Sequence, residues 1–307
     1  MDKTNKPRIG FIGLGMMGSA MVQRLLSCDY SLTIVAHKNR TNIDAAVAKG
    51  AKEVATPAEL AQVSDIIMLC VDTSAAVEKI MRGENGILKQ LQPNSLVIDF
   101  GTSIPGSTRQ LAQECLAKGA AMMDAPLGRT PVHALDGLLN IMAAGSVDDF
   151  ERAKPVLDDL GENVFHVGPI GAGHTLKLIN NFFAMTTACA MSEAFAMADL
   201  AGLERITLYE VMASGPLKSG MMDFIKAEAV DNDPKQLAFS VANGLKDVGY
   251  YVNMADDFGV ESFISPAIKK ILGLAKISGY GGKMVPELVD FMENTFSTKR
   301  DECKFDR

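Results

Sequence analysis

Three glycines near the start of the chain have the spacing of a turn that binds the pyrophosphate of a dinucleotide. Gly13, Gly15 and Gly18 follow an apolar, strand-like run and precede an amphipathic segment at about 19–26. The first glycine of such a turn permits the tight bend, the second lets the backbone approach the pyrophosphate, and the third lets the helix pack on the strand. The helix N-terminus adds N–H groups and a partial positive charge. We therefore predict that this turn, with Leu14, Met16 and Met17 between its glycines, binds a dinucleotide cofactor.

The end of the second predicted strand bears on which dinucleotide is preferred. Enzymes that use NAD usually carry an acidic residue here, which holds the ribose 2′-OH and repels a 2′-phosphate. This chain has His37, Lys38, Asn39 and Arg40 instead, and no acid before Asp44. We expect these four residues to contact the ribose end of the cofactor and to favour NADP over NAD, because basic side chains attract the 2′-phosphate. A basic surface turn that holds no ligand is the competing interpretation, and NAD remains an alternative.

A lysine stands within a long apolar helix that we predict from about His174 to Ala201. Lys177 and Asn181 are four residues apart, so they share one helix face. A desolvated ammonium has a depressed pKa that suits a general acid or base. The alternative is a lysine that reaches past apolar neighbours to solvent, and the spacing alone slightly favours this alternative.

The elements that position these residues change in kind along the chain. Up to about residue 167, apolar strand-like runs alternate with helical stretches, which implies a mainly parallel sheet with helices on both faces. After the glycine-rich segment 168–173 the strand pattern ends and helical patterns continue to about Phe296. The expected fold is α/β: a Rossmann-like, doubly wound N-terminal domain at 1–168, followed by an all-α domain at 169–307 for substrate binding and dimerisation. The strands are expected at Leu32–Ala36, Ile66–Val71, Leu96–Phe100, Ala121–Asp124, Leu138–Ala143 and Val164–Val167.

Composition excludes several classes of function. The 307 residues carry a net charge of −7 with no basic block, which argues against a nucleic-acid partner. The five cysteines lie far apart without a C-x-x-C pair, and the four histidines lack ligand spacing, so we expect a cytoplasmic protein without a metal site. No secretory signal or membrane-spanning run is evident.

Four separated blocks of this sequence resemble the β-hydroxyacid dehydrogenase family, which includes 3-hydroxyisobutyrate dehydrogenase and is similar to 6-phosphogluconate dehydrogenase. They lie in the family's order and span about residues 8–250. The blocks are F-I-G-L-G-M-M-G-S-A-M at 11–21, D-A-P-L-G-R-T at 124–130, G-A-G-H-T-L-K-L-I-N-N at 171–181 and L-K-D at 245–247.

The resemblance implies roles for particular residues. Lys177 would give a proton to the substrate carbonyl oxygen as hydride arrives from the nicotinamide, or take it in the reverse reaction, and Asn181 would orient the substrate. Val71, Thr102 and Lys246 occupy positions that imply cofactor binding. For Thr102 an ordinary turn or helix-capping residue is the alternative. The chemistry belongs to the cofactor, while the protein supplies position, a proton and the exclusion of water.

The chain departs from the family pattern in the substrate loop. Gly128, Arg129 and Thr130 replace the usual S-G-G, and this variant resembles the sulfolactaldehyde reductase and γ-hydroxybutyrate dehydrogenase branch. Arg129 brings a guanidinium that suits a carboxylate, sulfonate or phosphate. A solvent-exposed loop charge is the alternative interpretation. Arg24, where the family signature usually has asparagine, faces away from the glycine turn.

The sequence therefore predicts an oxidoreductase that transfers hydride between a nicotinamide cofactor and a small acidic aldehyde or a 3- or 4-hydroxy acid. We expect a homodimer or homotetramer, because the long apolar helix must be buried. One alternative is an imine reductase, although such enzymes commonly lack lysine at the position of Lys177. Another is a non-catalytic nucleotide sensor of the same fold, which would be expected to lose Lys177 or Asn181.

Overall fold

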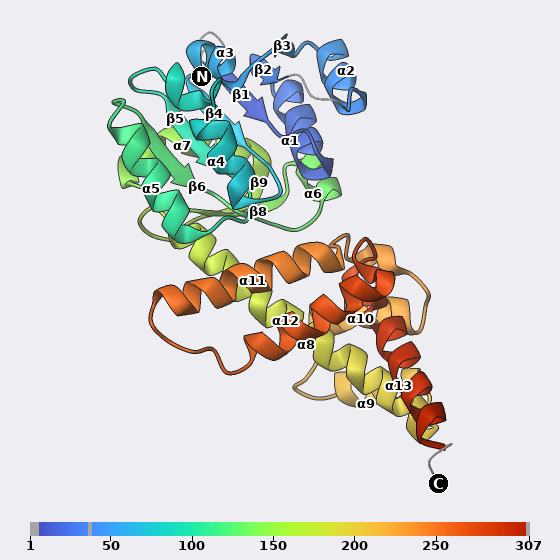
Figure 1. Cartoon of the computed structure of the whole chain (residues 1–307). Helices are drawn as coiled ribbons and strands as arrows, with labels where there is room; N and C mark the ends of the chain where they lie inside the picture. The colour runs from blue at the N-terminus through green and yellow to red at the C-terminus, as the bar shows by residue number, and fades with distance from the viewer. Residues whose placement is uncertain (1–5, 36–38, 305–307) are drawn as a thin grey trace. The chain divides into compact units, whose positions relative to one another are not determined.

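The computed structural model describes residues 6–35 and 39–304, with backbone alone from residue 298 onward. The chain forms two compact units, Met1–Lys177 and Leu178–Arg307, and the division falls within one long helix. Figure 1 shows the order of the elements in each unit. The domain boundary expected after residue 168 stays a prediction.

The first unit is built on a parallel sheet of six short strands. Their order is β3-β2-β1-β4-β5-β6, so the chain reverses its winding direction beside β1. All five neighbouring pairs are parallel. The strands are β1 (Ile9–Ile12), β2 (Leu32–Val35), β3 (Lys52–Val54), β4 (Ile66–Leu69), β5 (Leu96–Asp99) and β6 (Ala121–Asp124). This arrangement confirms the expected doubly wound, mainly parallel sheet.

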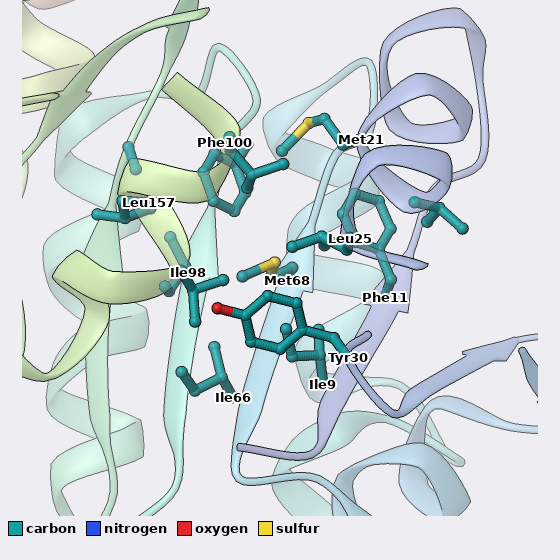
Figure 2. Close-up of a cluster of buried hydrophobic side chains, with 14 of the residues drawn as sticks. Ile9, Phe11, Met21, Leu25, Tyr30, Ile66, Met68, Ile98, Phe100 and Leu157 are labelled. Carbon is teal, nitrogen blue, oxygen red and sulfur yellow. The ribbon is translucent and has the colours of Figure 1, made fainter. Parts of the chain in front are cut away.

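Both faces of this sheet are covered by apolar side chains, as expected where helices pack on both sides. Alternate residues of a strand point to opposite faces: Ile66 and Met68 of β4 belong to one core, and Ile67 and Leu69 to the other. Figure 2 shows the first of these cores, with side chains of β1, β4 and β5 packed against Met21 and Leu25 of α1 (Met16–Ser27). The sheet is therefore a rigid base for the loops at its edges.

Three helices of the first unit, α3, α4 and α7, begin at side-chain caps. In α3 (Pro57–Val63), Thr56 accepts a hydrogen bond from the Glu59 N–H and proline occupies the first turn. On one face of the large sheet, the strands pack against α1, α2, α6 and α7. On the other face they pack against α3, α4 and α5. The remaining helices are α2 (Thr41–Ala48), α4 (Ser74–Arg82), α5 (Pro105–Leu116), α6 (Pro131–Asp136) and α7 (Val147–Leu160).

Two of the expected strands do not extend the large sheet. β8 (Leu139–Ala143) and β9 (Gly161–His166) pair in parallel, and β7 (Leu127–Gly128) joins β8 in antiparallel. Among the described residues, one bridge links these strands to the large sheet, and in this bridge Asp124 and Ala144 exchange backbone hydrogen bonds of 3.1 and 2.7 Å. The end of β8 therefore lies beside the end of β6, where the motif residues begin.

Among the described residues, the regular structure of the second unit is helical, apart from one isolated bridge between Ser240 and Met284. Its core includes Met185 and Phe195 of the long helix α8 (Ala172–Ala201), which begins in the first unit. The other helices are α9 (Arg205–Ala213), α10 (Gly220–Ala229), α11 (Val241–Asp257), α12 (Ser265–Ala275) and α13 (Leu288–Lys304). Within the described ranges, no helix combines the length and the apolar character needed to cross a membrane.

Candidate active site

The glycine turn between β1 and α1 has the geometry that its spacing predicts. Gly13 adopts φ +102°, and a Cβ atom there would overlap the carbonyl oxygen of Cys70. A Cβ at Gly18 would overlap the carbonyl oxygen of Gly13, so α1 packs directly on the turn. Gly15 has no atom within 4 Å of such a Cβ, and no side chain caps the helix that follows it. The backbone is thus open where a pyrophosphate must approach, and these residues fit a dinucleotide.

The start of α2 is joined to the glycine turn by a residue that the sequence patterns did not indicate. Asn42, in the first turn of α2, donates a hydrogen bond of 2.7 Å from its side-chain amide to the carbonyl oxygen of Leu14. Asn39 accepts a hydrogen bond from the Thr41 N–H at 3.1 Å. The contact of Asn42 holds the start of α2 beside the glycine turn. The expected contacts of His37 and Lys38 lie outside the described residues.

Arg40 already has two carboxylate partners. Its guanidinium contacts Glu53 of β3 at 2.5 Å and Asp44 of α2 at 2.7 Å. Hydrogen bonding to Arg40 lowers the pKa of the Glu53 carboxyl below its usual value. A cofactor phosphate at Arg40 therefore has to compete with two fixed anions.

The ends of β4 and β5 supply the other cofactor positions. A Cβ at Gly13 would lie 2.8 Å from Cγ1 of Val71, so the side chain after β4 lies against the glycine turn. Thr102 is half-buried in the loop after β5. That loop is folded around Asp99, which accepts a hydrogen bond of 2.8 Å from the Gly101 N–H. Both positions lie at the carboxyl ends of the strands, where doubly wound sheets bind ligands.

The start of α8 is held by the carboxylate at the end of β6. Asp124 is fully buried, and its two oxygens each accept a backbone hydrogen bond of 2.7 Å, one from the Gly171 N–H and one from the His174 N–H. Burial raises the pKa of the Asp124 carboxyl, while nearby His174 and the two backbone N–H groups lower it. A carboxylate at a helix N-terminus also interacts favourably with the helix dipole.

His174 joins this helix start to two further elements. Its Nδ1 lies 2.8 Å from the hydroxyl of Thr108 on α5. Its Nε2 is buried, makes no hydrogen bond to the described residues, and lies 3.7 Å from a carboxylate oxygen of Asp99. Ser103 donates to the same oxygen at 2.7 Å. The histidine, expected from its sequence spacing to be no metal ligand, instead lies between two buried carboxylates.

The predicted catalytic pair lies on successive turns of α8. Lys177 is half-buried, and Asn181 is buried. Asn181 donates a hydrogen bond of 2.6 Å from its amide nitrogen to Asp247 of α11. Because a carboxylate only accepts hydrogen bonds, this contact fixes the orientation of the Asn181 amide. The Lys246 ammonium lies 3.1 Å from the other Asp247 oxygen.

The substrate loop holds Arg129 in an unusual backbone conformation. Arg129 adopts φ +75°, in the left-handed region that favours glycine. Its Nη1 donates to the Leu138 carbonyl oxygen at 2.7 Å and contacts Glu162 of β9 at 2.5 Å. Gly128 lies in β7, and Thr130 precedes α6, with its hydroxyl 2.8 Å from Nδ1 of His133. The edge of the guanidinium formed by Nε and Nη2 makes no hydrogen bond to the described residues.

A surface depression of the first unit does not coincide with the predicted site residues. A depression of about 1320 Å³ is lined by Arg8, Asp65, Ser95 and Arg152. It lies at the amino ends of β1, β4 and β5, which is the edge of the sheet opposite to the motif residues. Among the residues that the structure describes, no three histidine, cysteine, aspartate or glutamate side chains gather as a metal site would require.

Both parts of the chain match models of known protein families. Residues 8–168 match the family model of the NAD-binding domain of 6-phosphogluconate dehydrogenase, and residues 171–291 match that described as NAD-binding of NADP-dependent 3-hydroxyisobutyrate dehydrogenase. The chain is 31% identical to a 3-sulfolactaldehyde reductase of Escherichia coli, over 89% of this chain and 91% of that protein.

Solved structures show the same arrangement of elements. A crystal structure of 3-hydroxyisobutyrate dehydrogenase from Salmonella typhimurium is 27% identical, with a TM-score of 0.81 over 93% of this chain and 100% of that one. An imine reductase from Myxococcus stipitatus is 20% identical, with a TM-score of 0.64 over 94% of this chain and 100% of that one, and therefore shares the fold alone.

Proposed function

The chain belongs to the β-hydroxyacid dehydrogenase family of nicotinamide-dependent oxidoreductases, and from this premise we propose that it reduces a small aldehyde bearing an acidic group, or oxidises the corresponding 3- or 4-hydroxy acid. The observation that carries the proposal is the pairing of Lys177 and Asn181 on one face of α8, with the Asn181 amide fixed by Asp247. Both residues would be dispensable in a protein that binds nucleotide without catalysis.

We assign each residue a role in this reaction. When bound, the nicotinamide supplies or accepts hydride at the carbonyl carbon. Lys177 donates a proton to the carbonyl oxygen during reduction and takes it back during oxidation. Asn181 orients the substrate with its amide, and Lys246 and Thr102 bind the nicotinamide half of the cofactor. Val71 and the turn from Gly13 to Gly18 bind the pyrophosphate half.

We propose NADP as the preferred cofactor because no carboxylate precedes Asp44 after β2. The engagement of Arg40 by Asp44 and Glu53 weakens its attraction for a 2′-phosphate, so His37, Lys38 and Asn39 would supply more of the preference. NAD is the alternative cofactor.

We propose that the substrate carries an anionic group remote from the aldehyde. Arg129, in the loop formed by Gly128, Arg129 and Thr130, would bind this group through the guanidinium edge formed by Nε and Nη2. The similar 3-sulfolactaldehyde reductase is named for an aldehyde with a sulfonate, which is consistent with an anion of this class.

The protein would act as a homodimer or homotetramer in the cytoplasm. The second unit exposes large apolar side chains that are costly to leave in water, among them Phe183, Phe258, Phe263 and Ile277. Phe263 is 97% exposed. Sedimentation that shows only particles of 32.9 kDa would contradict the oligomer.

A screen of semialdehydes and hydroxy acids with NADPH, NADH and their oxidised forms tests the proposal. The panel should pair each carboxylate or sulfonate substrate with a neutral aldehyde of the same length, and absorbance at the reduced-nicotinamide band reports turnover. We expect turnover with an acidic aldehyde and faster reaction with NADPH. Binding of nicotinamide cofactor without turnover on any member would favour the nucleotide sensor, and turnover on cyclic imines alone would favour the imine reductase.

A further inference from the structure

We propose that Asp124 is a positioning residue, which fixes the first turn of α8 and through it the placement of Lys177. The inference rests on the proposed role of Lys177. It assigns the aspartate of the D-A-P block to the helix rather than to the substrate. Both oxygens of its buried carboxylate already accept backbone hydrogen bonds, from Gly171 and His174, at 2.7 Å each.

The two glycines of the G-x-G block permit this contact. Gly171 adopts φ +88°, which turns its N–H toward the Asp124 carboxylate. A Cβ at Gly173 would lie 2.9 Å from Oδ2 of Asp124 and would overlap the carbonyl oxygen of Met142 on β8. The helix therefore starts in direct contact with the ends of β6 and β8, and a larger residue at either glycine would displace it.

A third contact fixes the rotation of the helix about its axis. The buried His174 ring contacts Thr108 of α5 and lies between the carboxylates of Asp99 of β5 and Asp124 of β6. Backbone contacts from Asp124 and ring contacts from His174 thus hold the first turn from three elements of the first unit. A helix held at only one point could slide or rotate by a fraction of a turn.

Lys177 follows His174 by three residues, which places it about 4.5 Å farther along the helix and on nearly the same face. Lys177 also belongs to the first unit. A shift of the first turn therefore passes to Lys177 without an intervening flexible segment. A displacement of about 1 Å at a reacting group costs up to about 100-fold in rate.

The test is Asp124→Asn, measured on the full-length protein. The amide keeps the size of the side chain but replaces one acceptor with a donor, so one of the two backbone N–H groups loses its partner. We expect kcat to fall about 10- to 100-fold, while the dissociation constant of NADPH changes less than about twofold. Hydrogen–deuterium exchange should become faster at the amides of residues 171–178 and remain unchanged in α1 and α7.

Gly173→Ala tests the same contact without removing a polar group. We expect it to reproduce the loss of kcat and the local exchange, and the double variant to lose little more than either single variant. Gly106→Ala is the matched control, because a Cβ at Gly106 meets no atom within 4 Å. Asp148→Asn is the second control, because Asp148 is an exposed carboxylate in the first turn of α7. Both controls should retain the kcat and exchange of the parent protein.

The outcomes separate this proposal from the proposed function. If the parent protein turns over no substrate, the proposed function fails, and exchange at residues 171–178 still tests the contact. Wild-type kcat in Asp124→Asn, or faster exchange throughout the first unit, would overturn the positioning role. If Asp124→Asn does not fold, Gly173→Ala decides, and a Gly173→Ala variant with normal kcat and normal exchange overturns the proposal.

Discussion

Lys177 is the residue on which the proposed proton transfer depends. We predict that Lys177→Ala lowers kcat by ~10²–10⁴, which is the usual contribution of a positioned general acid or base. Its half-buried position on α8 suggests that folding and NADPH affinity remain nearly unchanged. Initial rates and fluorescence titration with NADPH would measure both. Lys270→Ala, an exposed lysine of α12, is the control and should behave as the parent protein does. Near-normal turnover in Lys177→Ala would contradict the mechanism.

Substitutions at Arg129 distinguish a role in binding the substrate anion from a role in maintaining the shape of its loop. If its guanidinium binds the remote anion, Arg129→Ala should lose about 1.5–3 kcal/mol of transition-state stabilisation, the scale of hydrogen bonds to charged groups. The loss should be large for acidic aldehydes and small for neutral aldehydes of equal length. Arg129→Lys should recover part of it, because an ammonium keeps the charge without the planar fork. These comparisons require kcat/KM for matched substrate pairs.

The backbone at Arg129 provides a control for this prediction. At φ +75° alanine remains strained and glycine does not, a difference of roughly 1–2 kcal/mol. Loss of anion binding should therefore be equal in Arg129→Ala and Arg129→Gly. Loss of loop shape should be milder in Arg129→Gly and should affect charged and neutral substrates alike, which would remove Arg129 from substrate recognition.

At the scale of elements, we propose that the residues between β2 and α2 select the cofactor. We predict that His37→Asp shifts preference toward NAD, because the new carboxylate accepts from the ribose 2′-OH and repels a 2′-phosphate. The ratio of kcat/KM for NADPH and NADH measures the shift. Glu53→Gln should move the ratio the other way, by removing one of the two anions that hold Arg40. An unchanged ratio in His37→Asp would mean that the residues after β2 do not discriminate between the ribose 2′-OH of NADH and the 2′-phosphate of NADPH.

Local patterns predicted the elements better than the contacts between them. The fold class and family resemblance were confirmed, and β6 was predicted at its observed bounds, because periodicity and glycine turns are encoded in adjacent residues. The hydrogen bond from the Gly171 N–H to Asp124 joins residues 47 positions apart, and that from Asn181 to Asp247 joins residues 66 apart. No spacing rule indicates such pairs. The separate sheet of β7, β8 and β9 was missed for the same reason, since apolar alternation does not specify the neighbouring strand.

At the scale of the whole chain, the second unit contains a group of acidic residues that makes the stability of the fold depend on pH. Glu228 of α10 has a buried carboxylate oxygen with no hydrogen-bond partner among the described residues. Burial raises its pKa, and so do the charges of Asp290, Glu287 and Asp233, while Lys283 acts against them. The pKa of Asp290 is raised as well, again mainly by burial. The ionised form of Glu228 is therefore unfavourable in the folded state.

This shift has a defined consequence for stability. A carboxyl whose pKa is higher in the folded state than in the unfolded state stabilises the fold at pH values below 4.5, its pKa in the unfolded chain. This contribution is lost as the pH rises through the pKa of the folded state. Glu228→Gln does not titrate, so its melting temperature should exceed that of the parent protein at pH 7–8. The difference should disappear at pH values below 4.5. Glu210→Gln, an exposed glutamate of α9, should show no such dependence. A gain that is equal at all pH values would mean that Glu228→Gln acts through packing rather than through charge.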